Sequence, residues 1–222
     1  MSTAPDLPDL PPCPLPASAG PIESVEPERI SRLLNHGPTV LIGSADAGGR
    51  PNVMAAAWLM PLDFVPPKVA VVIDRSTWSR ELIEASGHFS INVPCRAQAD
   101  AVVQVGTLGG REALHQALPD KLAQTGLRWC DSGLAPSTPL IEGCVAWLVC
   151  RVIPQPTVLQ AHDLFLAEVL AAWADTRVFH DGRWFFDDPA HDALRTLHHV
   201  AGGAFFSPAD GLIGRAAPTH GP

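Results

Sequence analysis

The stretch NVMAAAWLMPLDFVPPKVAVVIDRSTWSREL, residues 52–82, carries the strongest structural signal in the chain. It opens with an apolar run of strand-like pattern that contains three consecutive alanines, Ala55, Ala56 and Ala57. Alanine is unfavourable in β-strands and offers little surface for packing, so three in a row need a physical reason. The residues alone leave two reasons open: a neighbouring backbone comes close to this strand, or a flat ligand lies against it.

The same stretch ends with cationic and hydroxyl side chains at the start of a predicted helix. They are Arg75, Ser76, Thr77, Ser79 and Arg80. The first turn of a helix presents free N–H groups and the positive end of the helix dipole, and arginine adds a bidentate partner for phosphate oxygens. An ordinary N-cap with solvated arginines is the alternative, but a cap needs only one hydroxyl. The pattern therefore favours an anion site.

Short, turn-bounded runs rich in β-branched residues dominate the rest of the chain. We expect helices over 27–36 and 76–88, a hairpin over 178–186, and strands over 39–46, 52–60, 68–74, 89–94 and 139–156. Residues 99–127 suggest two helical pieces around a glycine-rich loop, whereas 162–175 is compatible with helix or strand. Because the strands do not alternate regularly with helices, the pattern predicts a mainly β fold with short helices, arranged as a β-barrel.

Composition excludes several classes of function. The net charge is −8 and the two lysines and the arginines form no basic run, which is unlike a nucleic-acid-binding protein. The five cysteines lack zinc-site spacing and predict reduced thiols of a cytosolic protein. We recognise no signal peptide or membrane span, so we expect a cytoplasmic protein with neither membrane nor nucleic acid as partner. The adjacent His198 and His199 cannot face one metal ion, and we expect no metal site.

We expect one domain with two terminal extensions. Residues 1–25 are rich in proline and predict an extended arm, and residues 26–205 form the domain. Residues 206–222 carry turn residues and little hydrophobic pattern, which predicts a mobile tail. The aromatic-rich segment 183–206 either lies at a subunit interface or closes the core of its own barrel.

The run RPNVMAAAWLMPLDFVPPKVAVVIDRSTWSRELIEASGHFSINVP, residues 50–94, resembles the flavin reductase-like family. These are the FMN-binding split barrels that include flavoredoxins and NAD(P)H:flavin reductases. Weaker family-like signals follow in VGTLGGRE at 105–112, DKL at 120–122 and HDLFLAEV at 162–169. The resemblance extends over residues 38–204 and implies a split β-barrel of the FMN-binding type.

In such proteins the flavin ring lies against the strand after the Pro-Asn turn, and the phosphate sits at the start of the following helix. The resemblance therefore implies cofactor contacts at Asn52, Val53, Met54, Ala55, Ala56, Ala57, Asp74, Arg75, Ser76, Thr77, Ser79 and Asn92. Many relatives carry hydroxyl residues where this chain has Ala55 and Ala57, so those side-chain contacts are absent here.

Two further residues have candidate roles at such a site. His162 is the best candidate for acid or base chemistry, with a structural hydrogen bond as the alternative. Cys95 is either a reactive thiol near the flavin or a plain buried one.

The resemblance also implies a function. We expect an FMN-binding oxidoreductase in which NAD(P)H reduces the flavin by hydride transfer, and a small-molecule electron acceptor or a partner oxidoreductase then takes the electrons. Because the cofactor carries the chemistry, neither a catalytic triad nor paired carboxylates are needed. A homodimer with flavins in clefts at the interface is implied as well. The alternatives are an FMN-binding electron carrier or sensor without nucleotide turnover, and a structural dimer that has lost its flavin.

Overall fold

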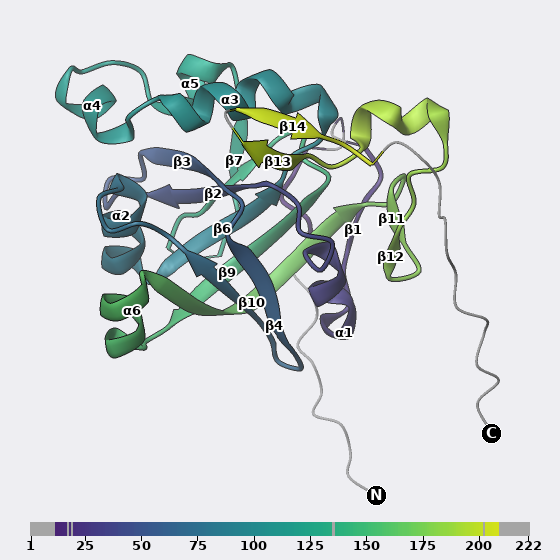
Figure 1. Cartoon of the computed structure of the whole chain (residues 1–222), viewed down its shortest axis with the longest axis horizontal. Coiled ribbons are helices and arrows are strands. Elements are labelled where there is room, and N and C mark those ends of the chain that lie inside the picture. The colour runs from purple at the N-terminus through teal and green to yellow at the C-terminus, as the bar shows by residue number, and fades with distance from the viewer. Residues whose placement is uncertain (1–11, 17, 19, 135, 202, 209–222) are drawn as a thin grey trace, which may run out of the picture.

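The centre of the molecule is an open antiparallel sheet (Figure 1). The computed structural model describes residues 12–208 apart from residues 17, 19, 135 and 202. The strands lie in the order β3-β2-β6-β9-β10-β5-β4, and β1 also pairs with β10. They are β1 (Ile22–Ser24), β2 (Val40–Ala45), β3 (Pro51–Ala56), β4 (Leu59–Phe64), β5 (Pro67–Val72), β6 (His88–Val93), β9 (Ala146–Ile153) and β10 (Leu164–Asp175). The mainly β fold predicted from the sequence is confirmed.

Short helices and small hairpins surround this sheet. The helical elements are α1 (Pro27–Ile30), η2 (Ser31–Leu33), α2 (Trp78–Ser86), η3 (Arg96–Gln98), α3 (Ala99–Thr107), α4 (Gly110–His115), α5 (Lys121–Thr125), α6 (Pro156–His162) and η4 (Pro189–Leu194). The hairpins are β7 (Trp129–Asp131) with β8 (Pro139–Ile141), β11 (Phe179–His180) with β12 (Arg183–Trp184), and β13 (His198–Ala201) with β14 (Ala204–Phe206). In Figure 1, α3, α4 and α5 lie along one side of the sheet, and β13–β14 lies beside α3. None of the described helices is long and apolar enough to pass through a membrane.

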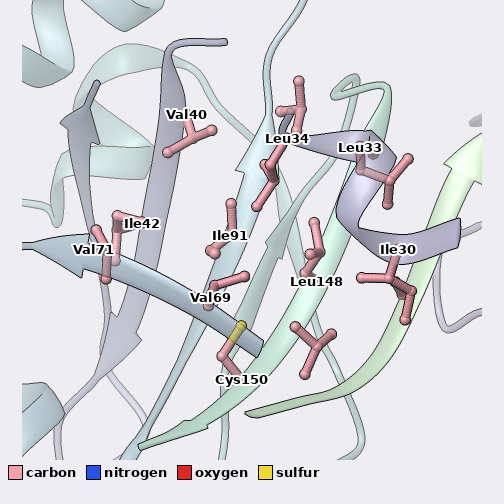
Figure 2. Packing of buried hydrophobic residues seen from close by; sticks show 14 of the residues in the cluster. Ile30, Leu33, Leu34, Val40, Ile42, Val69, Val71, Ile91, Leu148 and Cys150 are labelled. Carbon is pink, nitrogen blue, oxygen red and sulfur yellow. The ribbon is translucent and has the colours of Figure 1, made fainter. Parts of the chain in front are cut away.

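Buried side chains hold both faces of the sheet. Val40 and Ile42 of β2 belong to one apolar cluster, whereas Leu41 between them belongs to the other, because successive side chains of a strand point to opposite faces. Figure 2 shows the first cluster, in which the α1–η2 segment brings Ile30, Leu33 and Leu34 over the strands. The fully buried Trp147 and Trp173 fill the second cluster.

The single strand expected over 52–60 is two strands. β3 ends at Ala56 and β4 begins at Leu59, which leaves Ala57 and Trp58 between them. β3 pairs with β2 and β4 pairs with β5, so the two strands occupy opposite ends of the sheet order. The chain must therefore leave one edge and cross to the other at this point.

Other local expectations are met more closely. The helix after β5 is capped by Thr77, whose hydroxyl accepts a hydrogen bond from the Arg80 amide at 3.3 Å. It ends at Gly87, whose φ of 70° lies in the left-handed region that favours glycine. The expected strand over 139–156 is split into β8 and β9, and the ambiguous segment 162–175 is mostly the long strand β10.

The terminal segments take part in the fold where they are described. Ile22 to Ser24, within the segment expected to be an arm, pair with Asp175 to Trp173 of β10, so the sheet begins before residue 26. At the other end, Phe206 lies in β14 and the Pro208 carbonyl accepts a hydrogen bond from Arg195 Nη1 at 2.5 Å. Residues 1–11 and 209–222 lie outside the described residues, and the domain boundaries stay a prediction.

Replacement of Leu148 by alanine tests the first cluster. This side chain is 0% exposed at the middle of β9, so we expect Leu148→Ala to lower the free energy of unfolding. The loss should be about 2–5 kcal/mol through lost burial and a cavity. Leu114→Ala, at a side chain that is 39% exposed, should change it by less than about 0.5 kcal/mol. Urea unfolding followed by circular dichroism measures both, and equal effects would contradict this account of the core.

Candidate functional site

Two cavities meet at the end of β3. The first, the alanine cavity, has a volume of about 690 Å³ and is lined by Ala55, Ala56, Ala57 and Trp58 together with residues of α3, the α6–β10 junction and β13–β14. The second, the lysine cavity, has a volume of about 600 Å³ and is lined by Asn52, the start of α2, residues 105–112 and Lys121. Met54, Ala55 and Gly106 line both. Their volumes fall within the range of about 300–1,000 Å³ that is usual for ligand pockets.

The alanine cavity is bounded by small side chains on one wall and apolar ones on another. The alanines come from the end of β3, which is an edge strand of the sheet. Val102 and Val103 of α3 and Phe205 of β14 also line it. Polar groups enter from the α6–β10 junction and from β13, where His162 and His199 line the cavity. A flat apolar molecule with a polar rim would match this lining.

The lysine cavity contains a buried cation. Lys121, the first residue of α5, is 6% exposed, and its ammonium makes no ion pair with any residue that the structure describes. Burial lowers the pKa of Lys121 to about 8, so most of the population stays protonated at pH 7. A desolvated charge without a partner is unfavourable. Lys121 is therefore suited to an anionic ligand.

The N-terminus of α2 faces the same cavity with three hydroxyl residues, Ser76, Thr77 and Ser79. Asp74 orders the turn before the helix, because its carboxylate accepts hydrogen bonds from the Ser76 hydroxyl at 2.6 Å and the Ser76 amide at 2.8 Å. These bonds lower the pKa of Asp74. Asn52 Nδ2 donates to the Ser79 hydroxyl at 2.8 Å, which ties β3 to α2. The positive end of the helix dipole adds to the attraction for an anion.

The glycine-rich loop before α4 packs closely on this site. A Cβ atom added at Gly110, the first residue of α4, would lie 2.4 Å from Asn52 Oδ1 and 2.8 Å from Trp78 Cε3, so a larger residue would displace these two side chains. In the sequence, GTLGG at 106–110 lacks the spacing of a dinucleotide fingerprint. The structure gives this loop a steric role at the wall of the lysine cavity.

Most of the residues predicted from the sequence come together at the two cavities. Those that line one or both are Asn52, Met54, Ala55, Ala56, Ala57, Asp74, Ser76, Thr77, Ser79 and His162. Three predicted contact residues, Val53, Arg75 and Asn92, do not line either cavity.

Arg75 is turned toward α6 instead of toward a ligand. Its Nη2 lies 3.0 Å from Asp163 Oδ1 and donates to the Gln160 carbonyl at 3.0 Å. Arg80 is buried and pairs with the same carboxylate at 3.1 Å, and its Nη1 also donates to the Ile73 carbonyl. Asp163, with a φ of 53°, thus engages both arginines of the motif. Arg75 thus does not line either cavity in this arrangement, and the phosphate role expected for it stays a prediction.

Val53 and Asn92 are structural. Val53 is 0% exposed and packs in the second apolar cluster, because the alternation of β3 turns it away from the cavities. The buried amide of Asn92 donates to the Leu41 carbonyl at 3.0 Å and accepts from the Ile141 amide at 2.9 Å. These bonds connect β6 to β2 and β8, and the cofactor contact expected for Asn92 stays a prediction.

His162 and Cys95 differ in their access to the cavities. His162 is the exposed last residue of α6 and lines the alanine cavity. Cys95 is 1% exposed, donates to the Gly143 carbonyl at 3.4 Å and lines neither cavity. Burial raises the pKa of the Cys95 thiol, which is the environment of an unreactive cysteine.

The sequence reading did not identify Lys121, Trp58, His199 or Phe205 as cavity residues. For Lys121 a signal existed, because DKL at 120–122 is one of the family-like motifs and the chain has only one other lysine. His199 and Phe205 lie in the aromatic-rich segment 183–206, but their place beside β3 of the same chain depends on tertiary packing.

Comparisons with known proteins agree with this geometry. The model of the Flavin reductase like domain matches residues 32–189. The uncharacterized protein YddH of Escherichia coli (strain K12) is 46% identical over 183 residues, which cover 82% of this chain and 92% of YddH. A flavin reductase of Pseudomonas putida is 30% identical over 129 residues, 57% of this chain and 68% of its own.

Solved structures share the fold. An FMN-binding domain of a flavin reductases-like enzyme from Shewanella baltica OS155 superposes with a TM-score of 0.80 at 43% identity, covering 88% of this chain and 98% of that one. Flavoredoxin of Desulfovibrio vulgaris (Miyazaki F) has a TM-score of 0.66 at 23% identity, with 80% and 90% covered. The fold is thus the split β-barrel, and the chain belongs to the flavin reductase-like family.

Proposed function

We propose that this chain binds FMN and acts as an oxidoreductase that receives hydride from NAD(P)H. The observation that carries the proposal is the buried side chain of Lys121, whose ammonium has no ion-pair partner among the described residues. It lines one cavity with the hydroxyl-rich start of α2, while three alanines line the adjoining one. One end of this space suits a phosphate and the other suits a flat ring. FMN has both parts in one molecule.

The residues present fit this cofactor. The ring would lie against residues 54–57, where small side chains allow close approach to the edge strand. The phosphate would be held by Lys121 and by Ser76, Thr77 and Ser79 at the start of α2. Because Ala55 and Ala57 carry no hydroxyl, backbone groups would supply the polar contacts to the ring there.

FMN, when bound, supplies the redox chemistry by accepting a hydride from NAD(P)H and passing electrons to a small-molecule acceptor or a partner oxidoreductase. The residues of the chain would hold the cofactor, orient it and shield it from water. Val102, Val103 and Phe205 exclude water from the alanine cavity, and Asn52 fixes the start of α2 against β3. His162 stands at the cavity from the α6 side, where it can hold or give a proton.

Replacing Lys121 tests the phosphate site. We expect Lys121→Met to weaken FMN about ten- to a hundredfold and riboflavin much less, because one charge-assisted contact to the phosphate is lost. In the unsubstituted protein, FMN affinity should fall as the pH rises through about 8, where free Lys121 loses its proton. Titration of apoprotein with each flavin, followed by flavin fluorescence, measures both effects.

Lys68→Met is the matched control for this prediction. Lys68 pairs with Asp63 at 2.7 Å and lines neither cavity, so both affinities should stay unchanged. Arg75→Ala should likewise spare the preference for FMN, since Arg75 is engaged by Asp163. Equal losses of FMN and riboflavin in Lys121→Met would refute the assignment of the phosphate.

Anaerobic reduction of the bound flavin tests the proposal that the protein receives hydride from NAD(P)H. NADH or NADPH added to the FMN-loaded protein should bleach the flavin absorbance, whereas an electron carrier without nucleotide turnover would keep its colour. His162→Gln should slow the bleaching by about a hundredfold or more if the imidazole transfers a proton, with FMN affinity unchanged. A rate equal to that of the unsubstituted protein would assign His162 a structural role.

The proposed form is a homodimer that covers the exposed row of β4. Trp58, Met60, Leu62 and Phe64 alternate along this segment and are 76%, 55%, 45% and 65% exposed. Exposed apolar rows of this kind mark interaction surfaces. Trp58 also lines the alanine cavity, so a second copy seated here would help to close it. Of the two roles left open for segment 183–206, packing on its own core is the one that Trp184 and Phe186 take, whereas a role at the interface stays a prediction.

Phe64→Glu should give a monomer that binds FMN less tightly, because a charge in the apolar row opposes its burial. Leu118→Glu, at a side chain that is 42% exposed away from β4, is the control and should remain dimeric. Sedimentation of the FMN-loaded proteins at low concentration gives the answer. A stable monomer of the unsubstituted protein that keeps its FMN would contradict both the dimer and the shared cleft.

A further inference from the structure

Two histidines share one buried hydroxyl next to the alanine cavity. Thr196, which is 0% exposed, has its Oγ1 at 3.1 Å from His36 Nε2 and at 3.2 Å from His198 Nε2. The two imidazole rings lie edge to face with centroids 5.3 Å apart. A neutral imidazole can donate or accept through Nε2, so two neutral rings can satisfy this hydroxyl together. We name this group the His36–Thr196–His198 junction.

The junction lies at the base of the β13–β14 hairpin. The Thr39 amide donates to the Leu197 carbonyl at 2.7 Å, and the His199 amide donates to the Thr39 hydroxyl at 2.9 Å. These two bonds fix the start of β13 against the residue that precedes β2. Further along the hairpin, His199, Gly203 and Phe205 line the alanine cavity. The hairpin that forms this cavity wall therefore starts directly beside the junction.

A hydrogen bond with the backbone of Gly37 favours the charged form of His198, but burial outweighs it. His36 Nδ1 is buried and has no hydrogen-bond partner among the described residues. Trp184 packs against the His36 ring at a centroid distance of 5.1 Å, and Phe206 stacks on His198 at 5.5 Å. Protonation of both rings would place two positive charges with ring centroids 5.3 Å apart. Among the described residues, no carboxylate forms an ion pair with His36 or His198.

Charged side chains on the surrounding elements are engaged elsewhere. Arg32 of η2 donates to the Gly182 carbonyl, Arg183 of β12 lies over the Phe185 ring, and Arg195 before the junction pairs with Asp192. β14 and β2 carry no titratable side chain. Burial, and next the proximity of His198, lowers the pKa of His36 to about 3, and burial lowers the pKa of His198 as well.

We propose that the His36–Thr196–His198 junction is an acid-sensitive contact whose protonation releases the β13–β14 hairpin from the alanine cavity. The release of the hairpin is independent of the proposed function. One consequence of the release, weaker binding of FMN at acid pH, rests on the proposed function.

The direction of the pH effect follows from proton linkage. In the released state both imidazoles are in water and have the ordinary pKa of about 6.5, whereas the docked state lowers the pKa of both rings. The docked state, in which the β13–β14 hairpin contacts the alanine cavity, is therefore most stable above pH 6.5 and becomes less stable as the pH falls below this value. Each histidine makes docking up to about tenfold less favourable per pH unit below that value.

Amide hydrogen exchange measures the release directly. In the unsubstituted full-length protein, protection factors of the amides in residues 197–201, corrected for the intrinsic pH dependence of exchange, should fall about ten- to a hundredfold between pH 7.5 and 5.5. Those of β9 should not change, which shows that the rest of the sheet stays folded. A protection factor of 197–201 that is equal at the two pH values would overturn the proposal.

Substitutions show whether the pH dependence of hairpin protection comes from the junction or from other histidines. His198→Gln and His36→Gln can still bond the Thr196 hydroxyl but cannot take up a proton, so each should reduce the pH dependence, and the double variant should abolish it. His191→Gln is the control, because His191 pairs with Asp188 outside the junction and should leave the pH dependence intact. If a variant does not fold, an NMR titration of the unsubstituted protein decides: His36 must titrate well below pH 6.5, and a midpoint near 6.5 in the docked state would refute the proposal.

FMN release, followed by fluorescence over the same pH range, tests the consequence. Loss of FMN that parallels the loss of hairpin protection supports the link between junction and cavity. If the amides of the hairpin lose protection at acid pH but the protein binds no FMN at any pH, the junction is supported. Only the proposed function is then contradicted. FMN affinity that stays constant while the hairpin is released would overturn the link.

Discussion

The strand order of the open sheet ends at two edge strands, β3 and β4, and the way in which each of them is covered organises the molecule. An edge strand presents backbone N–H and C=O groups without partners, which proteins cover or protect. β3 lies under α3 and α5 and borders both cavities, whereas β4 carries a row of exposed apolar side chains. Because the chain passes directly from β3 to β4, Ala57 and Trp58 join the cavity to the exposed row.

Three charged or titratable groups near the cavities are in different states: one is ion-paired, one is neutral, and one is charged without an ion-pair partner among the described residues. Asp163 is paired with Arg75 and Arg80, which anchors α2 to the α6–β10 junction and fixes the direction of the helix N-terminus. His36 is kept neutral by burial. Lys121 is the exception, since it is buried and mostly charged without an ion-pair partner in the described part of the chain. An uncompensated charge is costly in a folded protein, and such costs concentrate at binding sites.

Local sequence signals were reliable where neighbours along the chain decide the outcome. Thr77 and Gly87 mark the ends of α2, because a cap hydroxyl and a left-handed glycine act within one turn. The alanine run marks the end of β3 at the cavity, and the family resemblance led to the split β-barrel. The break between β3 and β4 was missed, because it follows from which strands pair and not from the residues at 57 and 58.

The sequence by itself determined the fold class, the helix that presents its N-terminus to the site, and the small side chains of β3. Only the tertiary structure decided that Lys121 lines the cavity beside that helix whereas Arg75 does not. Arg75 is near the hydroxyls in sequence, but Asp163, 88 residues away, takes its guanidinium, while Lys121 reaches the cavity from α5. Asn92 is likewise bonded to Leu41, 51 residues away. Side-chain partners of this kind are set by three-dimensional packing, so the spacing of residues along the chain does not reveal them.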